Sequence, residues 1–247
     1  DAKRIGDEFE LPQGFKRSYK NIVCTGLGGS AIGADLARSY IAGDAQVPVL
    51  VNRNYTLPNF VTGDTLVIVS SYSGNTEETL SAYREAVSRG SSIIAITSGG
   101  KLEKAAKEDD FPCLIIPDGF PPRCALGYSF FPLLAVLAKI GIIRDQAGSI
   151  DDAIHNLIKL KDSKIGYKVP RKNNPAKKMA AEIFGKLPVI YASQDHMDAV
   201  VTRWRGQLAE NSKTLSSGHL FPEMNHNEIV GWENPKEVLK ECVAVIL

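Results

Sequence analysis

The sequence predicts an α/β protein, built on a parallel β-sheet with helices on both faces. Short apolar runs rich in valine and isoleucine alternate with stretches of helical periodicity, and this alternation is typical of such sheets. Two of the runs pass into glycine-rich or serine-rich loops before the next helix begins. Such loops lie at the carboxyl ends of parallel strands, where ligands bind. With 247 residues, the chain can form one large domain or two smaller ones.

The first part of the chain contains five expected strands. Residues 1–20 are charged and predict a lead-in helix that ends before Leu11-Pro12. The expected strands are 21–25, 47–51, 66–69, 92–97 and 111–116. Helical periodicity is present at 31–41, from 76 onward and at 129–140. We therefore assign residues 1–148, lead-in helix included, to a first domain.

The second part of the chain repeats the strand–helix order over a shorter length. An amphipathic helix at 150–160 and a basic stretch at 161–178 suggest a connection covering 149–178. The expected second domain, 179–247, contains a strand at 187–192, a helix at 196–210, a loop at 216–222 and a strand at 243–247. A doubly wound domain has more strands than these, so we expect it to be incomplete at its C-terminus.

Composition favours a small-molecule ligand over a macromolecular one. Lysine and arginine number 29 against 28 aspartate and glutamate residues, a balance that favours neither a nucleic acid nor a membrane as partner. No run approaches the roughly 18 apolar residues of a membrane helix, and the N-terminus lacks an apolar signal core. The four cysteines are scattered without metal-type spacing. We expect a cytoplasmic protein without a metal or cofactor.

The loop after the third expected strand has the features of a phosphate site. Ser71, Ser73 and Thr76 surround Gly74, and a helix with acids in its first turn follows. The free amides and the positive dipole end of that helix favour an anion. No Gly-Lys-Ser/Thr follows the glycine, which excludes a Walker-type loop and favours a monophosphate. The alternative is that these residues serve only turn geometry and capping.

The glycine-rich loop after the first strand is the second candidate. Gly28 and Gly29 let the backbone approach a ligand closely, and Ser30 is expected to open the next helix. A dinucleotide fingerprint of the variant form GxGxxA is formally possible, with Ala31 in the last position. No acidic residue ends the following strand to hold a ribose, so we prefer a close backbone approach to a phosphate.

Five motifs together resemble one known superfamily. They are GLGGSAIGADL at 26–36, SSYSGNTEETL at 70–80, PRCALGY at 122–128, ENSK at 210–213 and PEMNHNE at 222–228. Over nearly the whole chain, in this order, they resemble the sugar isomerase (SIS) domain superfamily. Within it they are similar to the bifunctional phosphoglucose/phosphomannose isomerases. The resemblance implies two tandem SIS domains, each a flavodoxin-like αβα sandwich, commonly assembled as a homodimer.

The resemblance also implies roles for individual residues. The glycine and hydroxyl positions fall on the sugar-phosphate-binding positions: Gly29, Ser30, Ser71, Ser73 and Thr76, with Gly28 beside them. Arg123 corresponds to an arginine near the reacting carbons, and Glu210 to the catalytic base. His226 corresponds to a ring-opening histidine donated by the neighbouring subunit. The family also uses a lysine and a threonine near its C-terminus, and this sequence ends before both.

These residue types suit an aldose–ketose isomerisation through a cis-enediol. One carboxylate moves a proton between C1 and C2, which Glu210 can do. A histidine suits opening of the sugar ring, and two neighbouring asparagines could fix the tautomer of His226. Arg123 would offset charge on the enediolate oxygens. The alternatives are an exposed acid at a helix end, an interfacial or capped histidine, and a surface arginine.

Other functions remain open on the sequence alone. An SIS domain can be a regulatory sugar-phosphate sensor, but a sensor has no use for Glu210 and His226 together, and no helix-turn-helix precedes the domain. A pentose-phosphate isomerase, or the isomerase half of an amidotransferase, is a further possibility. Those enzymes lack the Asn-His-Asn-Glu pattern, and no N-terminal glutaminase cysteine is present. The sequence therefore favours interconversion of glucose 6-phosphate, mannose 6-phosphate and fructose 6-phosphate.

Overall fold

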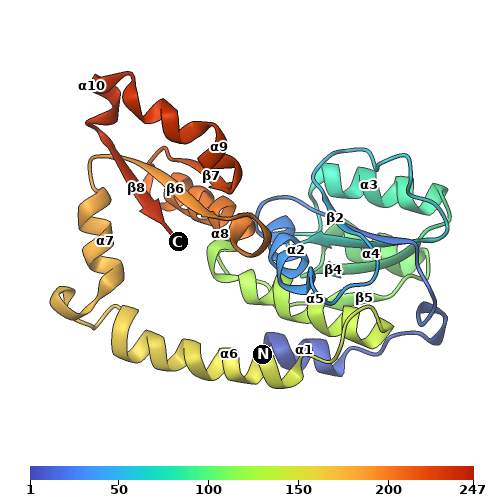
Figure 1. Ribbon diagram of the computed structural model, residues 1–247. Coiled ribbons are helices and arrows are strands. Elements are labelled where there is room, and N and C mark those ends of the chain that lie inside the picture. The colour runs from blue at the N-terminus through green and yellow to red at the C-terminus, as the bar shows by residue number, and fades with distance from the viewer. The chain divides into compact units, whose positions relative to one another are not determined.

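The computed structural model describes residues 1–247, apart from the side chain of Pro122. The chain divides into two compact units, Asp1–Ala147 and Gly148–Leu247, which we describe one at a time (Figure 1). A separate connecting segment at 149–178 stays a prediction. Within the described residues, no helix combines the length and the apolar character needed to cross a membrane.

The first unit is built on a five-stranded parallel sheet. Its strands, in the order β2-β1-β3-β4-β5, are β1 (Asn21–Thr25), β2 (Val49–Asn52), β3 (Thr65–Ser71), β4 (Ser92–Thr97) and β5 (Cys113–Ile115). All seven residues of the central strand β3 are buried, as expected for a strand covered on both faces. The predicted parallel α/β sheet is confirmed, with β1 and β4 at the predicted residues.

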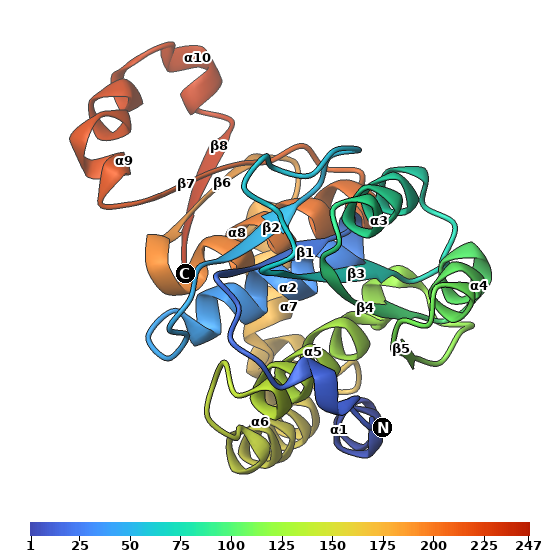
Figure 2. The ribbon, with the colours of Figure 1, turned by 90° about the vertical axis from the view of Figure 1, so that its right-hand side faces the viewer.

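Helices cover both faces of this sheet (Figure 2). One face packs against α3 (Glu77–Ser88) and α4 (Gly100–Glu108), in a core that includes Val67 and Ile93. The alternate side chains of the same strands, such as Ile68 and Ile94, are also fully buried and face the other way. Three helices lie on that side: α1 (Ala2–Glu8), α2 (Gly28–Ile41) and α5 (Leu126–Ile140). The three-layer arrangement leaves the loops at the strand ends free to bind a ligand.

The second unit has a smaller parallel sheet in the order β7-β6-β8. Its strands are β6 (Leu187–Ser193), β7 (Ser217–Phe221) and β8 (Cys242–Ile246). Side chains of α7 (Pro175–Ile183) and α8 (Gln194–Gln207) pack on one face, around Ile190. The other face packs around Tyr191, against α9 (Glu223–His226) and the 3-10 segment Glu228–Glu233. The remaining helices are α6 (Ala147–Leu160) and α10 (Lys236–Leu239).

The loop predicted at 216–222 is wrong, because Ser217–Phe221 forms strand β7 beside β6. Its sequence, SGHLF, has neither an apolar run nor an alternating pattern. Gly218 is what the packing requires: an added Cβ would lie 2.6 Å from Val201 Cγ1 of α8 and 3.1 Å from the Ile190 carbonyl oxygen. The strand is therefore specified by its neighbours more than by its own composition.

Candidate functional site

The hydroxyl-rich turn follows β3 and leads into α3. Ser71 is buried at the end of the strand, and Thr76 is the N-cap residue of the helix. Their hydroxyls form a hydrogen bond with each other, with 3.0 Å between the oxygens. The Ser73 hydroxyl is exposed and accepts a hydrogen bond from the Asn75 amide at 3.3 Å. The predicted hydroxyls of Ser71 and Thr76 therefore lie together, whereas that of Ser73 stabilises the backbone of the turn.

The loop after β4 holds this turn in place. The Tyr72 carbonyl accepts hydrogen bonds from the amide of Ser98, at 3.0 Å, and from its hydroxyl, at 2.5 Å. The Gly74 carbonyl accepts a bond from the Leu102 amide at 2.9 Å. Gly74 has a φ of +65°, and an added Cβ would lie 1.7 Å from the Gly99 carbonyl oxygen. The turn therefore requires glycine both for its backbone conformation and for this close approach.

Replacing Gly74 by alanine should unfold this turn and lower the stability of the first unit. We expect a loss of about 3 kcal/mol or more, since the left-handed backbone costs about 1–2 kcal/mol and overpacking adds to it. Gly90 is a matched control, with a φ of +67° and no atom within 4 Å of an added Cβ. Urea unfolding followed by circular dichroism measures both variants. Equal losses for Gly74→Ala and Gly90→Ala would contradict the contact with Gly99.

The glycine-rich turn lies beside the hydroxyl-rich turn. It follows β1, which pairs in parallel with β3, so the two turns leave the same edge of the sheet. The helix predicted to begin at Ala31 begins at Gly28, which has a φ of +52°. Ser30 is thus inside the first turn of α2, and its buried hydroxyl oxygen accepts a hydrogen bond from the Tyr72 amide at 3.0 Å. This bond joins the two turns.

The combined turns bring together the groups from which the sequence predicts an anion site, and that site stays a prediction. The first amides of α2 and α3 have no acceptor within their own helices, and both dipoles are positive at these ends. Gly28 and Gly29 present backbone without side chains. The hydroxyls of Ser71 and Thr76 bond each other, which leaves this pair one further proton to donate. This edge of the sheet therefore offers neutral hydrogen-bond donors to a phosphate.

Arg123 belongs to the same unit and reaches this edge through its loop. It is exposed in the 3-10 turn Pro122–Cys124, which connects β5 to α5. The loop is tied to the hydroxyl-rich turn because the Phe120 amide donates to the Tyr72 hydroxyl at 2.9 Å. The start of α5 is tied to the other turn, where the Ser129 hydroxyl donates to the Gly29 carbonyl at 3.1 Å. Both contacts place the Arg123 loop beside the two turns.

Glu210 lies in the second unit, in a π-helical turn. The helix predicted at 196–210 ends at Gln207 and continues as the π-turn Leu208–Ser212, a distortion frequent at functional sites. Glu210 is exposed. Lys213, three residues later, donates from Nζ to the Glu210 backbone carbonyl at 2.7 Å. The lysine therefore holds the turn and leaves the carboxylate open to a ligand.

His226 is the last residue of the short helix α9, and its ring is exposed. The expectation that both neighbouring asparagines fix its tautomer is wrong for Asn227. The Asn227 amide oxygen accepts from the Glu228 amide at 2.6 Å, and its Nδ2 donates to Glu223 Oε1 at 2.6 Å. Asn227 thus shapes the backbone after the histidine and does not contact the ring.

A polar cluster that the sequence did not reveal lies directly after His226. The two Glu228 carboxylate oxygens lie 2.5 Å from the Tyr191 hydroxyl and 2.7 Å from His219 Nδ1. Trp232 Nε1 donates to the same Tyr191 oxygen at 2.7 Å. The two partners of the Glu228 carboxylate come from β6 and β7, and Trp232, which bonds Tyr191, comes from the 3-10 segment after α9. Since β7 was expected to be a loop, nothing in the sequence placed His219 next to Glu228.

Burial of Tyr191, followed by its hydrogen bond to Glu228, raises the pKa of this phenol to about 12. The unfolded chain loses the proton near pH 10, so the stabilisation is complete below pH 10 and is lost as the pH rises towards 12. Between these values we expect the free energy of unfolding to fall more steeply in the wild type than in Tyr191→Phe, by up to about 1.4 kcal/mol per pH unit. Urea titrations from pH 9 to pH 12 measure the slopes. A Tyr167→Phe variant, which changes a side chain that is 93% exposed, is the control.

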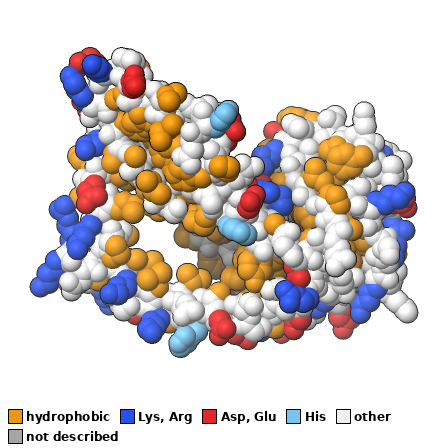
Figure 3. All heavy atoms as spheres, in the orientation of Figure 1, with side chains coloured by type: hydrophobic (Ala, Val, Ile, Leu, Met, Phe, Trp, Pro, Cys, Tyr) orange, Lys and Arg blue, Asp and Glu red, His pale blue; other side chains and the backbone are white. Residues whose placement is uncertain are grey.

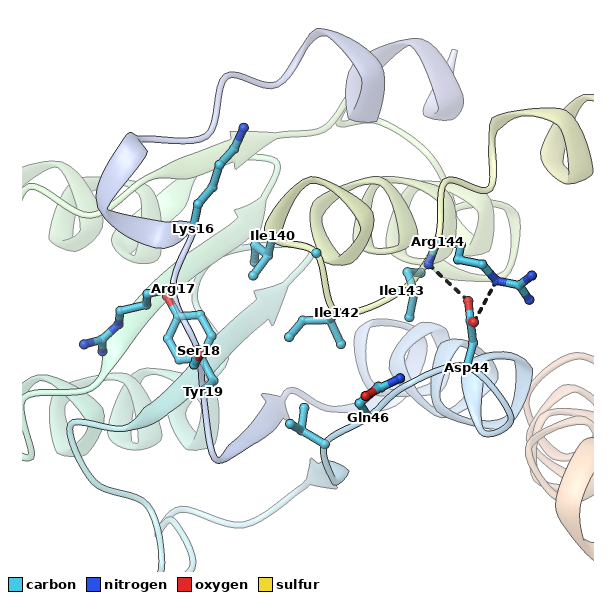
Figure 4. Close-up of a pocket in the computed structure, with 12 residues that line it drawn as sticks. Lys16, Arg17, Ser18, Tyr19, Asp44, Gln46, Ile140, Ile142, Ile143 and Arg144 are labelled. Atoms are coloured by element: carbon cyan, nitrogen blue, oxygen red, sulfur yellow. Dashed lines mark hydrogen bonds and ion pairs between the residues drawn. The ribbon is translucent and has the colours of Figure 1, made fainter.

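A hollow of about 670 Å³ lies elsewhere on the first unit (Figure 4). Its walls are residues 16–19, 44, 46–47 and 140–144. The first two segments precede β1 and β2, so this hollow is at the amino ends of the strands, opposite to the two turns. Arg144 Nε pairs with Asp44 at its rim, at 2.9 Å. The hollow is not part of the predicted phosphate site.

Among the side chains that the structure describes, no three histidine, cysteine, aspartate or glutamate residues are grouped so that they could hold a metal ion. The candidate site residues thus fall into two sets. Gly28, Gly29, Ser30, Ser71, Ser73, Thr76 and Arg123 belong to the first unit, and Glu210 and His226 to the second.

Comparison with known proteins assigns both halves of the chain to one superfamily. A family model for the SIS domain matches residues 17–117. A model described as the bacterial phospho-glucose isomerase C-terminal SIS domain matches residues 172–247. These matches confirm two tandem SIS domains. The C-terminal domain of glucosamine-fructose-6-phosphate aminotransferase from Francisella tularensis has the same fold, with a TM-score of 0.70 and 17% identity over 99% of this chain and 80% of that one.

Two curated relatives are more similar in sequence. The chain is 46% identical to a bifunctional phosphoglucose/phosphomannose isomerase of Caldicellulosiruptor bescii, over 94% of this chain and 72% of the relative. It is 41% identical to the protein of the same name from Aquifex aeolicus, over 88% of this chain and 64% of the relative. The matched region thus spans about two thirds of the length of these relatives.

Proposed function

Because the chain belongs to the family of bifunctional phosphoglucose/phosphomannose isomerases, we propose that it interconverts fructose 6-phosphate with glucose 6-phosphate and mannose 6-phosphate. One observation carries the substrate class. Two helix-opening turns at the carboxyl ends of adjacent parallel strands are joined by the bond between Ser30 and Tyr72. They offer amides and hydroxyls but no formal positive charge, which suits a sugar monophosphate.

The phosphate end of the sugar would bind at these two turns. Gly28, Gly29 and Ser30 supply the start of α2, and Ser71 and Thr76 supply the start of α3. The Ser30 hydroxyl accepts from Tyr72, so its proton remains available to a phosphate oxygen. Ser73 is exposed at the rim of the turn and would contact the phosphate after a rotation of its side chain.

The carbonyl end of the sugar would react with Glu210, Arg123 and His226. Glu210 removes a proton from C1 of the open-chain ketose and returns it to C2, with a cis-enediolate between the two steps. Arg123 offsets the negative charge that develops on the enediolate oxygens. His226 transfers the proton that opens the furanose ring. Acceptance of both C2 epimers requires a site that tolerates either orientation of the C2 hydroxyl.

We further propose that the protein works as a homodimer in which His226 serves the partner's site. His226 is exposed, and the apolar side chains of Ile229 and Val230 that follow it are 51% and 71% exposed. Figure 3 shows hydrophobic side chains gathered on one face of the second unit. An exposed apolar surface of this kind favours a protein interface. The catalytic histidine would then lie at the rim of that interface.

A coupled assay of the intact protein with fructose, glucose and mannose 6-phosphates tests this function. We expect turnover of all three, without added metal or cofactor. Inorganic phosphate should compete with each substrate, because it would occupy the two turns. Tight binding of fructose 6-phosphate without turnover would instead identify a sugar-phosphate sensor.

A further inference from the structure

We propose that Glu228 is a positioning residue for His226, because it fixes the segment that carries the histidine onto the sheet of the second unit. The inference rests on the proposed function, in which His226 opens the sugar ring. Glu228 is two residues after the histidine and joins that segment to two strands, through Tyr191 of β6 and His219 of β7.

The His226 side chain makes few contacts that could fix its position. It is exposed at the end of a helix of only four residues, and no hydrogen bond or ion pair is found for its ring among the described residues. The position of the ring therefore depends on the backbone of the segment. Met224 packs that backbone against the sheet from one side, next to Val189 and Tyr191. A second attachment is needed after the histidine to fix its orientation.

Glu228 is that second attachment, and the strands to which it binds are firmly placed. Tyr191 is 1% exposed and lies in β6, the central strand, which pairs with β7 and β8. The Tyr191 hydroxyl donates to one carboxylate oxygen and accepts from Trp232 Nε1. His219 Nδ1 lies 2.7 Å from the other oxygen, which only accepts, so the ring donates. Bonds to a carboxylate are stronger than neutral ones.

The backbone between His226 and Glu228 is fixed by Asn227. Its amide group bonds both the Glu228 amide and the Glu223 side chain, and these bonds bracket the histidine. With Glu228 attached to the sheet, the histidine is held between two anchored residues, Met224 and Glu228, each two positions away from it. Without Glu228, the next attachment to the sheet after the histidine is Trp232, six residues away. A displacement of about 1 Å at a catalytic group can cost about 100-fold in rate.

Glu228→Ala should therefore lower kcat for fructose 6-phosphate by about 100-fold, with little change in KM, because the phosphate grip lies in the first unit. Glu228→Gln should retain most of the activity, since its amide oxygen can accept from Tyr191 and its NH₂ group can donate to a neutral His219. Glu233→Gln is the matched control, because Glu233 is an exposed acid at the end of the same 3-10 segment.

An open-chain substrate separates ring opening from isomerisation. The probe 5-deoxyfructose 6-phosphate lacks the hydroxyl that closes the furanose, so it needs the carboxylate base but not ring opening. Exchange of its C1 hydrogen with D₂O measures the base alone. We expect Glu228→Ala to exchange this hydrogen at a rate near that of the wild type. A merely structural defect would lower the rates with both sugars equally.

Hydrogen exchange of the backbone adds a readout that does not depend on activity. In Glu228→Ala, the amides of residues 223–228 should exchange at least about 10-fold faster, while those of β6 stay protected. Unchanged exchange there, or wild-type turnover of fructose 6-phosphate by Glu228→Ala, would overturn the positioning role. If instead the wild-type protein turns over none of the three sugar phosphates, the proposed function fails, whatever the exchange result.

Discussion

Replacing Glu210 by glutamine should lower kcat for fructose 6-phosphate by about 1,000-fold to 10,000-fold. Glutamine has the size of glutamate but cannot accept the C1 proton, and the loss of a general base costs up to this amount. The fold of the turn should survive, because Lys213 bonds the Glu210 backbone carbonyl and not its carboxylate. KM should change little, since the phosphate would be bound by the first unit. A coupled assay measures both constants.

Exchange of the C1 hydrogen with D₂O measures the removal of the C1 proton directly. It should disappear in Glu210→Gln, for cyclic and open-chain sugars alike, and this distinguishes loss of the base from loss of ring opening. Glu182→Gln is the control, as Glu182 is an exposed acid on α7 of the same unit. If Glu210→Gln kept wild-type turnover, the base would have to be another residue.

The first sheet could be predicted from the sequence because its strands specify themselves. Strands β3 and β4 each contain a run of four apolar residues, mostly β-branched, at 66–69 and 93–96, and both runs are buried on both faces in the fold. Such runs have few alternatives to a central strand. Strand β5 was predicted at 111–116 and observed at Cys113–Ile115, since edge strands have only one neighbour to define their ends.

Strand β7 could not be predicted in the same way. It is short and polar, and it exists because β6 offers it a parallel edge and Gly218 allows α8 to approach. The assignment of β7 to a loop also affected the analysis of the polar cluster around Glu228. With β7 assigned to a loop, His219 had no fixed neighbours, and the partners of Glu228 stayed hidden. Contacts between residues distant in sequence leave no local signal.

In the candidate site, too, some features have a local signal in the sequence and others depend on contacts between distant residues. Turn residues such as Gly74 and Thr76 signal their places locally, through the positive φ that favours glycine and through a residue type preferred where a helix begins. The link between Ser30 and the Tyr72 amide joins residues 42 positions apart, and only the fold reveals it. The π-turn at Glu210 is likewise invisible in sequence periodicity. The sequence therefore identified most of the candidate groups but not the contacts that orient them.

Mixing protomers that carry Glu210→Gln with protomers that carry His226→Ala should restore activity that neither variant has alone. If His226 serves the partner's site, a mixed dimer has one site with both substitutions and one site with neither. Random exchange of protomers makes about half of the dimers mixed, so we expect about a quarter of wild-type activity. Co-expression with two different affinity tags, followed by sequential purification, isolates the mixed dimers, which should reach about half.

The outcome depends on which subunit supplies the histidine. If His226 acted in the site of its own chain, every site in a mixed dimer would lack one group, and no activity would return. The exposed His226 and the exposed Ile229 and Val230 support donation across an interface. Val230→Glu should then separate the protomers, because a charge in an apolar interface is costly. Light scattering should show monomers, and the cyclic substrate should lose turnover while open-chain exchange persists.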